Sequence, residues 1–130
     1  FDAAEKAVKL SLEINQDNTW AFHAYSHIFD ATCRSQEGVD FLDTNEKYLT
    51  DDNSLTCHLH WHQTVNYTEL GDYEKVLDIF DNHISPVFKR TGIPFNLNDG
   101  LEHINFFDQR IGGNHNTITD DTVNMFAKNP

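Results

Sequence analysis

The sequence predicts an all-α protein, an α-α superhelix of about three antiparallel helical hairpins that is a fragment of a longer array. Three observations support this fold class. Apolar residues recur with helical spacing along almost the whole chain, and short clusters of turn-forming residues separate the periodic segments. In addition, one pattern of small and large apolar residues recurs three times in the same register.

The first half of the chain contains three predicted helices. Residues 3–14 place small and aliphatic side chains on one face, and the turn formers at 15–18 end this helix. The spacing predicts a second helix over 19–32 and a third over about 36–49. The connections between them are short, as antiparallel hairpins require.

The second half contains four further predicted helices, which span residues 54–70, 73–84, 98–111 and 119–128. Gly71 stops the first of these helices, and Asp72 is a good N-cap for the next. Pro86 and Pro94 bracket a stretch that we expect to be an irregular connector.

These helices form one predicted domain over residues 1–130. Residues 1–16 are the second helix of a first hairpin, whose partner helix is expected upstream. Two full hairpins follow at 19–49 and 54–85, and a third is predicted at 98–128, where the repeat signal is weaker.

The repeat pattern pairs a small or branched residue with a larger apolar residue four positions later. The three pairs are Ala4 and Val8, Gly38 and Leu42, and Val76 and Phe80. The offset from Ala4 to Gly38 is 34 residues, which is the tetratricopeptide period. The offset from Gly38 to Val76 is 38 residues, and a four-residue insertion in the loop at 50–53 accounts for the difference. The small residue marks a place where two helices approach closely.

Composition restricts the class of partner. The chain has 130 residues, of which 38% are hydrophobic, so it can form a core despite a net charge of −12. This acidic balance disfavours nucleic acids and anionic membranes, which need clustered Lys and Arg. Expected partners are a protein or peptide of basic character, a small-molecule ligand, or metal cations. No apolar run approaches the ~18 residues that a membrane span requires.

The two cysteines, Cys33 and Cys57, form no C-x-x-C pair and provide no disulfide framework. A reducing compartment is therefore expected, and we predict an intracellular, cytoplasmic protein. Organellar targeting stays open, because the sequence begins at Phe1 without an initiator Met.

Eight histidines are a high number for this length, and four of them form two pairs. His23 and His27 are four residues apart on one predicted helix, and His58 and His62 are four apart on another. This spacing places both rings of a pair on one helix face. If the repeat alignment holds, the two helices are neighbouring first helices of successive hairpins, and all four imidazoles face one cavity.

A metal site is one interpretation of these pairs. Four neutral imidazoles suit Zn²⁺ or another transition metal, and the predicted ligands are His23, His27, His58 and His62. Asp30 or Glu69 could accept a hydrogen bond from the N–H of a ligand. A zinc protease of the H-E-x-x-H type is disfavoured, because Ala24 and Leu59 occupy the positions that need Glu.

A groove that contacts a partner is the other functional interpretation. The residues predicted to line it are His23, His27, His58, Trp61, His62 and Asn66. The simplest alternative is structural: histidines between helices often only hydrogen-bond their neighbours, and aromatic residues at helical spacing, such as Trp20 and Trp61, are usually packed.

Several segments resemble one known family. They are Trp20–His27, Glu37–Leu42, His58–His62, Leu70–Glu74 and Phe80–Ile84, and they resemble the tetratricopeptide repeat protein 38 family. The resemblance covers about residues 1–85 and continues weakly to Asn98-Asp99-Gly100, where Gly100 replaces the Ala of that family. It implies an α-solenoid with no established reaction.

Three functions are therefore predicted as alternatives. The first is a protein- or ligand-binding repeat scaffold with an acidic, histidine- and aromatic-lined concave groove. The second is a metal-binding protein or metal-dependent enzyme that uses the four histidines. The third is an architectural subunit of a larger assembly. We predict no catalytic residue, and a non-enzymatic role is favoured over an enzymatic one.

Overall fold

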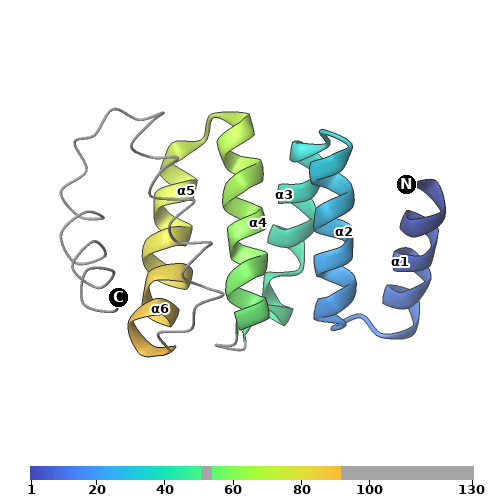
Figure 1. Cartoon of the computed structure of the whole chain (residues 1–130), viewed down its shortest axis with the longest axis horizontal. Helices are drawn as coiled ribbons and strands as arrows, with labels where there is room; N and C mark the ends of the chain where they lie inside the picture. The colour runs from blue at the N-terminus through green and yellow to red at the C-terminus, as the bar shows by residue number, and fades with distance from the viewer. Residues whose placement is uncertain (51–53, 92–130) are drawn as a thin grey trace, which may run out of the picture.

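A computed structural model of the protein describes residues 1–50 and 54–91, and within these ranges the only regular structure is helical. Figure 1 shows the helices standing side by side along the long axis of the molecule. The predicted all-α class is confirmed. The hairpin predicted at 98–128 and Pro94 lie outside the described residues. None of the described helices is long and apolar enough to cross a lipid bilayer.

The described α-helices are α1 (Asp2–Ile14), α2 (Thr19–Ala31), α3 (Ser35–Thr44), α4 (Ser54–Leu70), α5 (Tyr73–Ile79) and α6 (Ser85–Thr91). The predicted helices at 3–14, 19–32 and 54–70 agree with α1, α2 and α4 to within one residue at each end. Asp72 caps α5 as expected, since its side chain accepts a hydrogen bond from the Lys75 N–H.

The third predicted helix, 36–49, was expected to be longer than it is. α3 ends at Thr44, and a 3-10 turn (Glu46–Tyr48) continues the chain. Asn45 explains the end of the helix, because its side-chain amide donates to the Phe41 carbonyl at 2.7 Å. Such local bonds from Asn compete with continuation of an α-helix.

The chain around Pro86 was wrongly predicted to be an irregular connector. A π-helical turn (Phe80–Ile84) follows α5 and leads directly into α6, which contains Pro86. Pro86 is the second residue of α6 and has no N–H to bond back into the π-helical turn, which runs into α6 without a break. The wider π turn shifts the hydrogen-bond register just before the proline.

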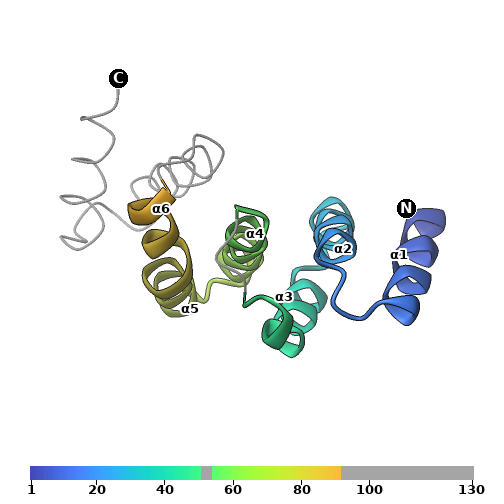
Figure 2. The same ribbon diagram turned by 90° about the horizontal axis from the view of Figure 1, so that it is seen from below.

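The helices lie in two layers. Figure 2 shows α2 and α4 in one layer and α3 and α5 in the other. α1 contacts α2, while α4 contacts α2, α3 and α5. Because α4 has neighbours on several sides, its middle section is buried nearly all round.

Three apolar clusters hold the layers together. Val8, Tyr25 and Phe29 join α1 to α2, whereas Phe22, Leu42 and Leu59 join α2, α3 and α4. A third cluster, which includes Val39, Cys57, Tyr67, Val76 and Phe80, joins α3, α4 and α5. The larger members of the predicted repeat pairs, Val8, Leu42 and Phe80, are all buried.

Gly38 marks a close approach between α3 and α4. A Cβ atom at this position would lie 2.9 Å from Oδ1 of Asn66, which is closer than such atoms come in proteins. The absence of a side chain at Gly38 therefore lets the Asn66 amide sit against α3. Ala4, the equivalent residue of the first repeat, is exposed, so the expected close approach is not made there.

Candidate metal centre

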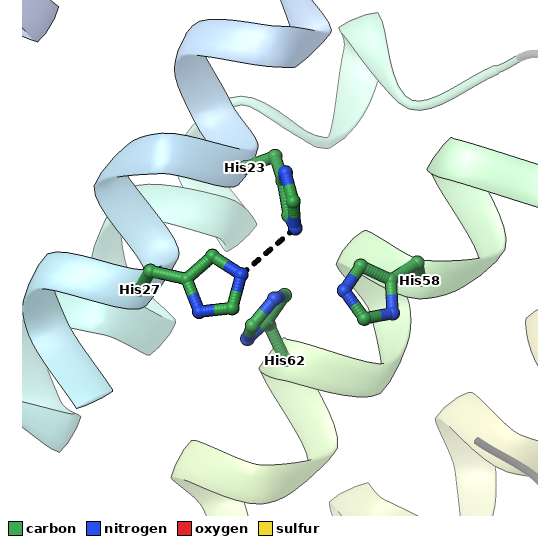
Figure 3. Close-up of side chains that lie close together, drawn as sticks. All are labelled: His23, His27, His58 and His62. Atoms are coloured by element: carbon green, nitrogen blue, oxygen red, sulfur yellow. Dashed lines mark hydrogen bonds between the residues drawn. The ribbon is translucent and has the colours of Figure 1, made fainter. Parts of the chain in front are cut away.

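The four paired histidines meet between α2 and α4 (Figure 3). The Asn18 side chain caps α2 by accepting a hydrogen bond from the Ala21 N–H. Both histidine pairs lie inside regular α-helix, one in α2 and one in α4. One ligand nitrogen from each of the four residues lies within 4.8 Å of the other three. We call His23, His27, His58 and His62 the four-histidine cluster.

Contacts between rings cross from one helix to the other. The ring centroids of His23 and His58 are 4.9 Å apart, and those of His27 and His62 are 4.6 Å apart. Within α2, Nε2 of His23 and Nε2 of His27 are separated by only 2.9 Å, the contact drawn as a dashed line in Figure 3. The four rings come together between α2 and α4 for two reasons. The pitch of each helix places the two histidines of a pair on one face, and the packing of α2 on α4 brings the two pairs together.

His62 has a well-defined orientation. Its Nδ1 lies 2.8 Å from Oδ2 of Asp30, and a carboxylate accepts hydrogen bonds only, so Nδ1 carries the proton. The lone pair is then on Nε2. This atom is buried and has no hydrogen-bond partner. Burial lowers the pKa of His62 below its ordinary value and so favours the neutral ring, although the hydrogen bond to Asp30 acts in the opposite direction.

Asp30 is itself positioned by Asn66. The Asn66 Nδ2 donates to the second carboxylate oxygen of Asp30 at 3.0 Å and to the His62 carbonyl at 2.9 Å. Asn66 is only 1% exposed. It was predicted to line a partner-contacting groove, but in this structure it lies beneath the cluster, where it orients Asp30.

Exposure increases across the cluster from α4 to α2. His62 and His58 are buried, with exposed fractions of 0% and 8%. His23 is half-buried and His27 is exposed. One side of the cluster therefore faces the interior and the other side faces solvent.

The two tryptophans flank the cluster differently. Trp61 stacks on His58, with ring centroids 5.1 Å apart and planes 8° from parallel, and it packs against the core beside α5. Trp20 is 69% exposed and meets the His23 ring edge-on at 6.0 Å. Trp61 thus holds a candidate ligand in place, while Trp20 is the more accessible indole.

The cluster has nearly the size that a small transition-metal ion needs. Zn–N bonds are about 2.0–2.1 Å long, so nitrogens at a tetrahedral angle on one ion lie about 3.4 Å apart. The ligand nitrogens of the four histidines lie at most 4.8 Å apart. This upper limit exceeds the tetrahedral N–N distance by about 1.4 Å. Small rotations of the four side chains can close that difference.

The four histidines that the sequence placed in two pairs lie together, and Asp30, one of the two predicted acceptors, contacts His62. The other predicted acceptor, Glu69, is exposed at the end of α4. Sequence reasoning missed a polar network on the opposite side of α4, where Asp43 accepts hydrogen bonds from both Gln63 and Tyr67. Desolvation and the Asp43 carboxylate raise the pKa of Tyr67. The spacing of four between Gln63 and Tyr67 was the available signal.

The chain matches no model of a known protein family. A search of solved structures also finds no significant match. The resemblance to the tetratricopeptide repeat protein 38 family therefore stays a prediction.

Proposed function

We propose that this protein binds a transition-metal ion, with Zn²⁺ the first candidate, through Nε2 of His62 and one nitrogen each from His23, His27 and His58. The observation that carries the proposal is the buried, unpartnered Nε2 of His62. A buried polar atom without a partner costs about 1–3 kcal/mol. A metal ion would give that lone pair a partner.

The hydrogen bond from His62 to Asp30 supports the same proposal. Histidine ligands of metals usually donate their other N–H to a carboxylate or carbonyl, which fixes the tautomer and increases the basicity of the ligating nitrogen. Asp30 makes this contact at 2.8 Å, and Asn66 holds Asp30 from the far side. One ring nitrogen of His62 also lies within 4.8 Å of a nitrogen from each of the three other imidazoles, a clustering that a purely structural histidine does not require.

The ligand set favours borderline metals. Four imidazoles suit zinc, copper, nickel or iron, whereas calcium and magnesium prefer oxygen ligands. Because two ligands come from α2 and two from α4, the ion would also tie these helices together. The proposed role is thus metal binding that stabilises the packing of the two helices.

Metal analysis of untagged protein tests the proposal. We expect about one equivalent of zinc or another transition metal in the wild type, and loss of that metal in His62→Ala. His60→Ala is the matched control, because His60 is also a buried histidine of α4 but points to Gln63 instead. If His62→Ala fails to fold, His27→Ala at the exposed edge serves the same purpose. No bound metal and no effect of added zinc on the melting temperature would contradict the proposal.

We also propose that the helices are tetratricopeptide-type repeats that present a binding surface to a protein or peptide. The burial of Gly38 and Val76, and of Leu42 and Phe80 four residues later, supports this repeat register. The placement of α2 and α4 in one layer is consistent with equivalent helices of successive repeats. Salt-sensitive binding of a basic peptide, lost in Trp20→Ala, would test the surface; equal binding by the variant would count against it.

A further inference from the structure

We infer, on the basis of the proposed metal centre, that the bound ion keeps one coordination position open towards solvent and that this position takes a small anion. The class of ligand is a compact oxygen or nitrogen donor with one negative charge, such as hydroxide or azide. Three features of the cluster lead to this inference: the direction from which the ligands come, their charge, and their unequal burial.

The ligands approach the ion from the helices. Figure 3 shows His23 and His27 reaching in from α2 and His58 and His62 reaching in from α4, with all four rings between the two ribbons. His58 and His62 are buried against the interior, whereas His27 is exposed. Water can therefore reach the cluster from the His27 side, while the His62 side is closed.

The charge of the ligand set favours an anion. Four neutral imidazoles leave the whole positive charge on a divalent ion, and Asp30, bonded to the ligand His62, offsets only one unit of it. Uncompensated charge in a partly desolvated site is costly. An inner-sphere anion removes the remaining charge directly.

The acidity of the whole chain does not reverse this preference. The net charge of −12 repels anions at long range, but surface charges are screened beyond about 8 Å at physiological ionic strength. An anion that coordinates the metal lies about 2 Å from the ion. At that distance the local attraction outweighs the screened repulsion from the rest of the surface.

The expected coordination change is from four ligands to five. Zinc sites that keep an open position sometimes expand to five ligands, whereas purely structural sites are closed at four. His27 is the ligand least restrained by packing, because its ring is exposed. It can therefore adjust to make room for a fifth ligand, while His62 stays fixed by Asp30.

Cobalt substitution tests the inference, because Co²⁺ occupies zinc sites and its visible absorption reports coordination number. The metal-free protein is loaded with one equivalent of Co²⁺ and titrated with sodium azide, with sodium perchlorate at equal ionic strength as the control. We expect an intense four-coordinate spectrum that weakens and shifts with azide, saturates at one anion per cobalt, and does not change with perchlorate.

The outcomes separate the two proposals. A cobalt spectrum that responds no more to azide than to perchlorate would show a closed site, which overturns the open position and leaves metal binding intact. A chain that takes up no Co²⁺ would overturn both. His60→Ala, which alters a buried histidine outside the cluster, should give the same azide response as the wild type.

Discussion

At the scale of single residues, the candidate site depends on a chain of contacts behind one imidazole. Gly38 leaves room for Asn66, Asn66 holds Asp30, and Asp30 orients His62. Each contact acts on the next through a distance or a hydrogen bond. A substitution at Gly38 should therefore alter the orientation of His62 through this series of contacts, although Gly38 itself lies outside the cluster.

Replacing Asp30 with Asn tests the carboxylate in this chain. Asp30→Asn keeps the size of the side chain but removes the charge that strengthens the His62 N–H bond. We expect metal affinity to fall by about 10- to 100-fold, measured by competition with a coloured chelator. Asp81→Asn, at an exposed carboxylate, is the control and should bind metal like the wild type. Unchanged affinity in Asp30→Asn would mean that the hydrogen bond does not support the ligand.

Gly38→Ala should disturb the same series of contacts at its first step, the contact between Gly38 and Asn66. The new methyl group would overlap the buried Asn66 amide, so we expect a loss of about 1–3 kcal/mol in the free energy of unfolding, measured with urea. The overlap disappears if Asn66 is shortened to Ala. Gly38→Ala should therefore cost much less in an Asn66→Ala background than in the wild type. Equal costs in both backgrounds would show that the two residues do not interact.

At the scale of elements, polar bonds as well as apolar contacts attach α1 to the rest of the molecule. Glu5 of α1 accepts hydrogen bonds from the Arg34 guanidinium at 2.8 and 3.2 Å and from the Tyr25 hydroxyl at 3.0 Å. Lys9 makes an ion pair with the same carboxylate. The hydrogen bond from Arg34, followed by those from Lys9 and Tyr25, lowers the pKa of Glu5 to about 2.

The pKa of Glu5 predicts how α1 responds to acid. Because the pKa is lower in the folded chain than its ordinary value of 4.5, the carboxylate stabilises the folded state above that pH. That contribution declines as the pH falls from about 4.5 towards 2. Glu5→Gln should remove this part of the pH dependence of stability. We expect weaker protection of α1 from hydrogen exchange at neutral pH, and a smaller loss of that protection as the pH falls below about 4.5. Glu13→Gln, at an exposed position of α1, should behave like the wild type.

Element boundaries show where local patterns are reliable. Asp72 was predicted as a cap because a cap involves residues only three apart in sequence. Asn18, predicted only as part of a turn, caps α2 in the same way. Pro86 was misjudged because the turn before it is π-helical, and nothing in the local pattern distinguishes that turn from the end of a helix. The burial of Ile84 and Val87 against α5 and α4 favours continuation of the chain as a helix.

At the scale of the whole molecule, metal binding and folding should be coupled. The proposed ligands come from two helices that only the folded chain brings together, so an unfolded chain cannot bind with the same affinity. At free zinc 100 times the dissociation constant, the free energy of unfolding should rise by about 2.7 kcal/mol. Thermal melts with and without zinc measure this change.

His27→Ala provides the control for that coupling. His27 is exposed, so its loss should cost the metal-free protein little stability, yet it removes one proposed ligand. Without metal, the melting temperature of the variant should be close to that of the metal-free wild type. Added zinc should raise the melting temperature of the variant much less than that of the wild type. An equal gain in the two proteins would mean that zinc stabilises the chain at some other site.

The sequence by itself determined the all-α class, the positions of α1, α2 and α4, and the alignment of each histidine pair on one helix face. These features follow from the pitch of the helix and from caps, which act over a few residues. Only the tertiary structure decided that Nδ1 of His62 bonds to Asp30, that Asn66 is buried behind it, and that Nε2 is left without a partner. These contacts join residues more than 30 positions apart, and their geometry depends on how α2, α3 and α4 pack, which no local pattern specifies.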